Sequence, residues 1–201
     1  MIQLEQYEGL IFDMDGTLID TMPCHVASWK DTSVFFDFPF LPEWLHSMGG
    51  MPSIKVVSEI NRRFGLSLDP AVVSSYKQNV FRELGCPGER IPSTCGILEQ
   101  YLGKKKIALG TGSPRTNAML LLENAGLLNK FDAIVTACDV DNHKPNPYTF
   151  LKACKLMALT PQQCVVFEDT LLGKQAAHAG GMDCILVTDG ELEFYPAEVN
   201  R

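Results

Sequence analysis

Short runs of consecutive apolar residues recur along the chain, one near the beginning and the others in the second half. Because neighbouring positions in a strand face opposite sides, an unbroken apolar run suits a strand that is buried on both faces. Such strands are typical of parallel sheets with helices on each side. We therefore predict buried strands at 9–14, 107–111, 133–136, 164–167 and 184–187.

Segments of helical length separate the later strands. Several of them have proline near the beginning or glycine after the end, a placement typical of helix termini. The predicted helices cover 93–102, 114–125, 147–159 and 171–179. This alternation of strands and helices predicts an α/β domain with a doubly wound parallel sheet.

The chain between the first predicted strand and the second is too long for one crossover connection, and it has little strand pattern. Three helices are predicted within it, at 23–36, 52–64 and 70–84. We expect residues 23–90 to form a small all-helical domain, inserted into a core made of residues 1–22 and 91–201. The insertion follows the carboxyl end of a strand, where such sheets bind ligands. It is therefore a candidate lid, or alternatively a packed extension without a function.

Composition narrows the choice of partner and location. The 201 residues are 46% hydrophobic and 20% charged, with a net charge of −7, so a globular chain is expected. A nucleic-acid partner is not expected, because it would require a basic surface. The longest uncharged stretch, 156–167, contains a proline and is shorter than the roughly 20 apolar residues of a membrane span. No basic residue occurs in the first eight positions, so we expect a cytoplasmic protein without a leader or a membrane partner.

The seven cysteines are an odd number and include no C-x-x-C pair. This pattern predicts reduced, mostly buried thiols and argues against a disulfide framework or a zinc site. The sequence implies no protein partner, and a small phosphorylated substrate would need only a few local cations.

Side chains able to bind an anion or a metal follow four of the predicted strands. They are Asp13 and Asp15 after the first, Thr111, Gly112 and Ser113 after the second, Lys144 after the third, and Glu168 and Asp169 after the fourth. These strand ends are expected to meet at one edge of the sheet. Carboxylates about 4 Å apart repel by roughly 4 kcal/mol per pair at an effective dielectric constant near 20, so a cation is needed among them. Hard oxygen ligands beside an expected phosphate favour Mg²⁺.

The order of these groups resembles the four motifs of the haloacid dehalogenase superfamily. The motifs are Asp13-x-Asp15-Gly-Thr-Leu, Thr111, Lys144-Pro and Glu168-Asp169. The surrounding sequence is similar to the β-phosphoglucomutase-like branch, which includes phosphatases of the fructose-1-phosphate type. The resemblance covers essentially the whole chain. It implies a Rossmann-like core with a cap domain, and a Mg²⁺-dependent phosphatase that acts on small phosphorylated metabolites.

The resemblance also implies a role for each motif residue. Asp13 would be the nucleophile that forms an aspartyl-phosphate, and Asp15 would protonate the leaving group and then activate water. Asp13, the Asp15 carbonyl and Asp169 would bind Mg²⁺, with Glu168 binding directly or through water. The groups that would contact the phosphoryl group are Thr111, Gly112, Ser113 and Lys144.

Three positions in the predicted cap are candidate substrate contacts. They are His25, where the mutase-like branch has a histidine, Gly50 in the loop at 48–52, and Lys55. Mutases of this branch carry an arginine in this loop, which suits a second phosphate because its donors bind phosphate bidentately. The loop has no arginine here. We therefore expect hydrolysis of a sugar monophosphate, with a phosphohexomutase as the alternative.

Other interpretations of single residues stay open. Asp169 could simply cap the helix that follows it, and His25 could be a packing or hinge residue. His46, His143 and His178 show no ligand spacing and are expected to be structural or on the surface. A signalling receiver domain also groups acids, a threonine and a lysine around a phosphorylated aspartate. The length of the chain and its helical insertion argue against a receiver.

Overall fold

A computed structural model describes residues 3–86 and 88–197. Its centre is a six-stranded sheet in the order β5-β4-β1-β6-β7-β8. The strands are β1 (Gly9–Phe12), β4 (Lys106–Gly110), β5 (Ala133–Val135), β6 (Cys164–Glu168), β7 (Asp183–Thr188) and β8 (Glu191–Tyr195). All neighbouring pairs are parallel except β7 and β8. The predicted α/β fold with a doubly wound, mostly parallel sheet is confirmed.

The antiparallel edge strand β8 was not predicted from the sequence. It follows β7 through a turn at Asp189 and Gly190, both of which have positive φ. An Asp-Gly pair with positive φ at both positions is the usual chemistry of a tight hairpin. The residues of β8 are mostly exposed or half-buried, so the strand has no continuous apolar run by which it could be recognised.

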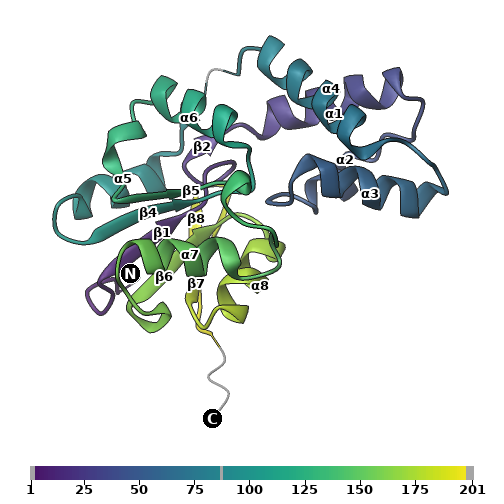
Figure 1. The fold of residues 1–201 in the computed structure, drawn as a ribbon. Helices are drawn as coiled ribbons and strands as arrows, with labels where there is room; N and C mark the ends of the chain where they lie inside the picture. Colours follow the sequence, from purple (N-terminus) through teal and green to yellow (C-terminus); the bar gives the residue numbers. More distant parts are fainter. Residues whose placement is uncertain (1–2, 87, 198–201) are drawn as a thin grey trace.

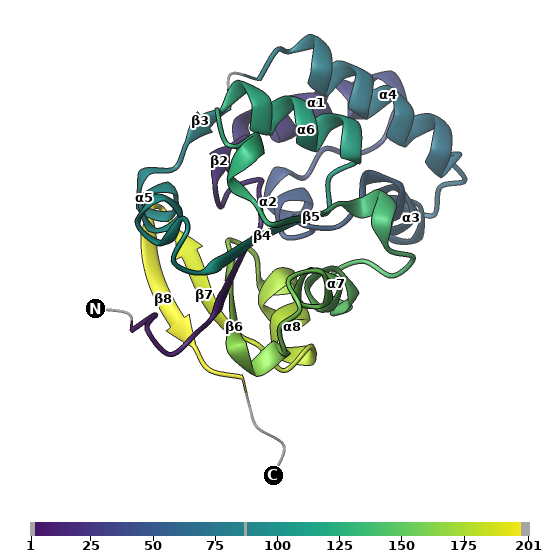
Figure 2. The ribbon, with the colours of Figure 1, turned by 60° about the vertical axis from the view of Figure 1, so that its left-hand side comes forward.

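Helices cover both faces of the sheet (Figures 1 and 2). Along β1, Leu10 and Phe12 pack into one buried cluster and Ile11 into another. The first cluster includes residues of α5 (Pro92–Tyr101) and α6 (Arg115–Asn124), and the second those of α7 (Tyr148–Leu156) and α8 (Leu171–Ala179). This alternation explains the unbroken apolar run of β1, because both faces of the strand are covered. Single 3-10 turns occur at η1 (Leu128–Lys130), η2 (Ala137–Asp139) and η3 (Pro161–Gln163).

A helical segment lies beside one end of the sheet (Figure 1). It consists of α1 (Met22–Phe35), α2 (Pro42–His46), α3 (Ser53–Phe64) and α4 (Pro70–Glu83). These helices have a buried apolar cluster of their own, which includes Trp29, Leu45, Val57 and Val73. The three helices predicted in this stretch are present, and the short helix α2 is additional.

Two short strands connect the helical segment to the sheet. β2 (Ile19–Asp20) pairs antiparallel with β3 (Glu89–Arg90), so the chain entering the segment runs beside the chain leaving it. The last two residues of the range 23–90, which was expected to be all-helical, therefore form a strand. A two-residue strand has too few positions to show a hydrophobic period.

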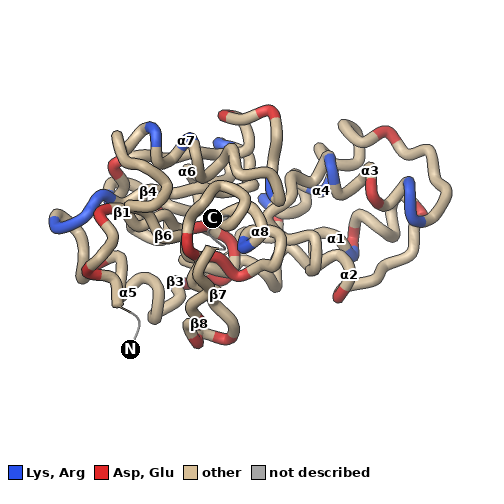
Figure 3. Tube along the Cα trace, turned by 90° about the horizontal axis from the view of Figure 1, so that it is seen from below, with Lys and Arg blue, Asp and Glu red and all other residues tan. Residues whose placement is uncertain are grey.

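Charged residues of both signs are distributed over the sheet and the helical segment (Figure 3). Within residues 3–86 and 88–197, none of the helices combines the length and apolar character that crossing a membrane requires.

Candidate active site

The carboxyl ends of β1, β4 and β6 meet at one edge of the sheet. Phe12 in β1 lies opposite Leu109 in β4 and Phe167 in β6. Residues that follow these positions are therefore brought together, as the strand order predicts. The helical segment faces this edge, and a cavity lies between them.

Lys144 connects two of the predicted acidic residues. Its Nζ donates to Oδ1 of Asp13 and to Oε1 of Glu168, each at 2.6 Å. All three side chains are buried, and the ammonium group lies 4.7 Å from the ring centroid of Phe150. Burial disfavours the ammonium, but the charges of Asp13 and Glu168 outweigh it and raise the pKa of Lys144. The lysine is therefore charged and fixed beside Asp13.

Three carboxylates surround this lysine. Asp13, Glu168 and Asp169 each have an oxygen within 4.8 Å of the others. Burial, with the charges of Glu168 and Asp15 adding to it and that of Lys144 opposing it, raises the pKa of Asp13 to about 8. Burial and neighbouring carboxylates also raise the pKa of Asp169 well above its usual range. The single positive charge of Lys144 does not balance the negative charges of the three carboxylates, whereas an additional divalent cation would. The donor set fits Mg²⁺, which binds carboxylate oxygens.

Glu168 and Asp169 differ in the number of hydrogen bonds that their carboxylate oxygens accept. Oε2 of Glu168 accepts hydrogen bonds from the amide and the hydroxyl of Thr170, at 2.9 and 2.8 Å, while Oε1 accepts from Lys144. Asp169 makes no side-chain hydrogen bond to any described residue. The N-cap of α8 is Thr170, whose hydroxyl accepts from the amide of Gly173 at 3.0 Å. Asp169 is therefore not the helix cap, and its oxygens are free to bind a metal.

Asp15 points to a different set of partners. Its carboxylate accepts hydrogen bonds from the hydroxyls of Thr21 and Ser113, at 2.6 and 2.7 Å, and from Nε2 of His25 at 3.2 Å. Burial acts to raise the pKa of Asp15, but these donors outweigh it and lower the pKa below its usual range. Ser113 was predicted to contact phosphate, yet its hydroxyl is used here to hold Asp15. Thr111 and the Gly112 amide remain the candidates for a phosphoryl oxygen.

His25 is held from its other side by Lys77, a residue of α4. Nζ of Lys77 lies 2.7 Å from Nδ1 of His25. When Lys77 is protonated, its ammonium can only donate, so Nδ1 accepts, and the Nε2 proton of a neutral imidazole donates to Asp15. Burial and the charge of Lys77 lower the pKa of His25, which favours this neutral form.

The sequence contains a signal for the burial of Lys77. It lies four residues after Val73 and four before Phe81, and both are buried. Lys77 thus shares the apolar face of its helix, where a solvated lysine would not be placed.

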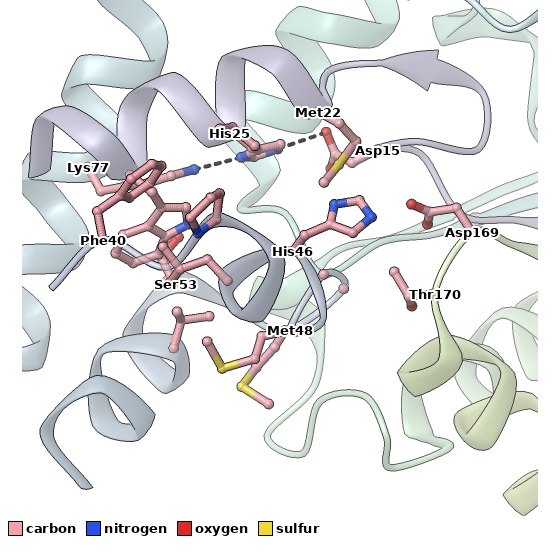
Figure 4. Close-up of a pocket in the computed structure, with 18 residues that line it drawn as sticks. Asp15, Met22, His25, Phe40, His46, Met48, Ser53, Lys77, Asp169 and Thr170 are labelled. Carbon is pink, nitrogen blue, oxygen red and sulfur yellow. Dashed lines mark hydrogen bonds and ion pairs between the residues drawn. The ribbon is translucent and has the colours of Figure 1, made fainter. Parts of the chain in front are cut away.

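The cavity between the helical segment and the sheet edge has a volume of about 70 Å³. Figure 4 shows side chains from both parts of the chain around it. Its wall is mostly apolar, with methionines, aromatics and aliphatic residues of the helical segment, and its polar end holds Asp15 and Asp169. His46 also lines it. His46 shows no ligand spacing in the sequence and was expected to be structural or on the surface. Its place at the cavity depends on α2, which was not predicted.

The loop at 48–52 lies directly on the sheet edge. Gly50 lines the cavity and approaches Gly112 so closely that a Cβ added to Gly112 would lie 2.1 Å from the Gly50 carbonyl oxygen.

Lys55, the third predicted cap contact, does not line this cavity. It lines a separate one of about 400 Å³ together with His143 and Lys144.

Comparisons with known proteins agree with this architecture. Residues 10–187 match the family described as haloacid dehalogenase-like hydrolase. Fructose-1-phosphate phosphatase YqaB of Escherichia coli is 36% identical over 181 residues, which cover 90% of this chain and 96% of that protein. β-Phosphoglucomutase of Bacillus subtilis is 26% identical over 194 residues, which cover 92% of this chain and 84% of that protein.

Among solved structures, β-phosphoglucomutase from Clostridium difficile is 25% identical, with a TM-score of 0.81 that covers 91% of this chain and 85% of that one. The fold and the family expected from the sequence motifs are thus confirmed, and this chain is an enzyme of the haloacid dehalogenase-like hydrolase family.

Proposed function

We propose that this enzyme is a Mg²⁺-dependent phosphatase of small phosphorylated metabolites, with a sugar monophosphate as its substrate. The observation that carries the proposal is the buried pair of Lys144 and Asp13, with Asp169 and Asp15 beside it. Phosphoryl transfer requires positioning and charge neutralisation around a nucleophile, and this site contains groups for both. The relatives support a phosphatase, and the E. coli fructose-1-phosphate phosphatase supports a sugar phosphate.

In the proposed mechanism Asp13 is the nucleophile. Its Oδ1 is bonded to Lys144, so Oδ2 attacks phosphorus, the ester P–O bond breaks, and the leaving alkoxide takes a proton from Asp15. Water then gives a proton to Asp15 and attacks the same phosphorus. The bond from phosphorus to Asp13 breaks, and inorganic phosphate leaves. Asp13, Asp169 and the Asp15 carbonyl would hold Mg²⁺, which supplies positive charge to the phosphoryl oxygens when bound.

Asp15 must be protonated for the first step, although its three donors favour the ionised form. Binding a phosphate dianion would raise its proton affinity, because a nearby negative charge disfavours a second one. Rotation of the Ser113 hydroxyl toward the phosphate would remove one of the donors. Asp15 then takes up the proton that the leaving group receives.

The position of the cavity supports a helical segment that acts as a cap. Residues of the helical segment and of the sheet edge both line it, so a movement of the segment would change the access of a substrate to Asp15 and Asp169. We propose that residues 23–90 form this cap and that it moves about the paired strands β2 and β3.

We also propose a cytoplasmic location. All seven cysteines are free thiols in the structure, which agrees with a reducing compartment.

A screen for phosphate release tests this function. Purified enzyme with Mg²⁺ is expected to release phosphate from at least one hexose or pentose monophosphate. The mutase alternative is tested with β-glucose 1-phosphate and a bisphosphate primer, by coupled detection of glucose 6-phosphate. Gly50 occupies the loop where an arginine would be needed, and Lys77, the cation in the cavity wall, is already bonded to His25. We expect hydrolysis without isomerisation, and isomerisation faster than phosphate release would reverse the assignment.

A further inference from the structure

The polar side chains of the cavity wall are not equally available to a substrate. The titratable residues that line it are Asp15, His25, His46, Lys77 and Asp169. Asp15, His25 and Lys77 form a continuous hydrogen-bonded chain. His46 and Asp169 make no side-chain hydrogen bond within residues 3–86 and 88–197, and Asp169 belongs to the proposed metal site. The imidazole of His46 is therefore the titratable group of the wall that is free for the organic part of a substrate.

His46 is presented at the polar end of the cavity. Figure 4 shows its imidazole pointing toward the space between Asp15 and Asp169. It also lines a second cavity of about 370 Å³ on the other side, together with Asp20, Asp169 and Asp189. The imidazole thus stands where two cavities meet, next to the group that would protonate the leaving oxygen.

The backbone that carries His46 is well supported. His46 is the last residue of α2, and its carbonyl accepts from the amide of Gly49 at 2.9 Å. The preceding residue, Leu45, is buried in the apolar cluster of the helical segment. Gly49 lies against Thr170, because a Cβ added to Gly49 would be 2.8 Å from Cγ2 of Thr170. The Cα of His46 thus has a defined position at the cavity, which specific recognition by its side chain requires.

We propose that His46 determines substrate specificity by hydrogen bonding a hydroxyl group of the leaving alcohol. Neutral imidazole offers one donor and one acceptor, which matches a hydroxyl that also donates and accepts. The remaining wall near it is apolar, with Met22, Pro42 and Leu45, and would pack against carbon atoms of the same alcohol. The ligand class is a neutral polyhydroxylated phosphate ester. This inference rests on the proposed phosphatase function.

The test compares two substrates that share the phosphate but differ in hydroxyl groups. Fructose 1-phosphate has a polyhydroxylated leaving group, and p-nitrophenyl phosphate has none. For His46→Ala we expect KM to rise about tenfold with fructose 1-phosphate, as expected for one lost hydrogen bond, and to stay unchanged with p-nitrophenyl phosphate. His46→Gln keeps a donor and an acceptor and should recover most of the loss. Glu43→Ala, an exposed residue of the same helix, is the control and should match wild type on both.

The outcomes separate this inference from the proposed function. If wild-type enzyme releases phosphate from neither ester nor from any hexose or pentose monophosphate of the screen, the phosphatase assignment fails and the inference fails with it. If another sugar monophosphate of the screen is hydrolysed in place of fructose 1-phosphate, that ester takes its place in the comparison. If wild-type enzyme is active and His46→Ala has an unchanged KM for fructose 1-phosphate, only the role of His46 is overturned. An equal fall of kcat on both esters would also overturn it, because that pattern indicates an effect on the chemical step. Thermal unfolding of each variant excludes loss of fold as the cause.

Discussion

Nζ of Lys77 lies 2.7 Å from Nδ1 of His25, and the lysine is almost fully buried, at 1% exposure. The hydrogen bond joins α4 to α1, and His25 extends it to Asp15 at 3.2 Å. The aromatic rings of Trp29 and Phe81 lie near the same nitrogen. A lysine of the helical segment is thus connected to the proposed acid of the sheet edge through one imidazole.

This buried lysine predicts a pH-dependent stability. Burial lowers the pKa of Lys77 from 10.5 to about 7, although Asp15 and Cys24 oppose the shift. Between these two values the unfolded chain binds the proton and the folded chain does not, so the free energy of unfolding rises with pH. The contribution is up to about 1.4 kcal/mol per pH unit. We expect the free energy of unfolding of wild type, relative to Lys77→Met, to rise by roughly 2 kcal/mol between pH 7 and 9, measured by urea unfolding.

The matched control for this experiment is Lys30→Met, which removes an exposed lysine of α1. Its stability difference from wild type should stay constant over the same pH range. A flat difference between wild type and Lys77→Met would show that Lys77 keeps its proton in the folded protein.

Sequence patterns predicted the sheet and the motif residues because both depend on local features. The apolar run before Asp13 is continuous because β1 is covered on both faces. The pairing of β1 with β6 then places Asp13 next to Glu168, the residue that follows Phe167. The sequence also predicted that Lys144 meets the carboxylates at this edge, but its two ion pairs, with Asp13 and Glu168, are seen only in the structure.

What the sequence did not predict depends on contacts between distant segments. Ser113 was expected to bind phosphate, but its hydroxyl donates to Asp15, and only the folded geometry shows this choice. Lys55 was expected near the substrate, yet it lines another cavity, together with His143 and Lys144. His46 lies in a short helix whose few residues give no hydrophobic period. Its position at the cavity depends on how the chain after α2 lies against Thr170, at Gly49.

Close backbone contact between Gly50 and Gly112 predicts a functional defect without a large loss of stability. A Cβ at residue 112 would lie 2.1 Å from the Gly50 carbonyl oxygen, so the loop at 48–52 must move away. Displacing a positioning group by about 1 Å can cost about 100-fold in rate. For Gly112→Ala we expect kcat/KM to fall by at least about tenfold, with a small change in Tm. Gly96→Ala, where nothing lies within 4 Å, should keep full activity. Equal activity of the two variants would show that the contact between this loop and the sheet edge is not needed for catalysis.

Mg²⁺ is expected to stabilise the protein through Asp169. At a concentration of about 100 times Kd, a ligand of the folded state adds about 2.7 kcal/mol, or roughly 5–10 °C in Tm for a chain of this size. This rise should disappear with EDTA and return when Mg²⁺ is restored. Asp169→Asn should reduce the rise and increase the Mg²⁺ concentration needed for activity. Asp189→Asn, which changes an exposed acid in the adjacent cavity, should respond as wild type does. Full activity in EDTA would exclude the proposed metal.

Replacing the proposed nucleophile gives the most direct test of the chemistry. Asp13→Asn keeps the shape of the side chain and removes the carboxylate that would attack phosphorus. The amide oxygen can still accept a hydrogen bond from Lys144. The substitution also removes one of three clustered carboxylates, which reduces their repulsion, so we expect the fold to be retained. Turnover should fall by at least about 1,000-fold, which corresponds to about 4 kcal/mol in the activation barrier. Asp20→Asn is the control, because Asp20 is an exposed acid of β2 outside the carboxylate cluster. If Asp13→Asn releases phosphate within tenfold of wild type while Asp20→Asn is unchanged, the covalent mechanism fails, and a water molecule rather than Asp13 must attack the phosphorus.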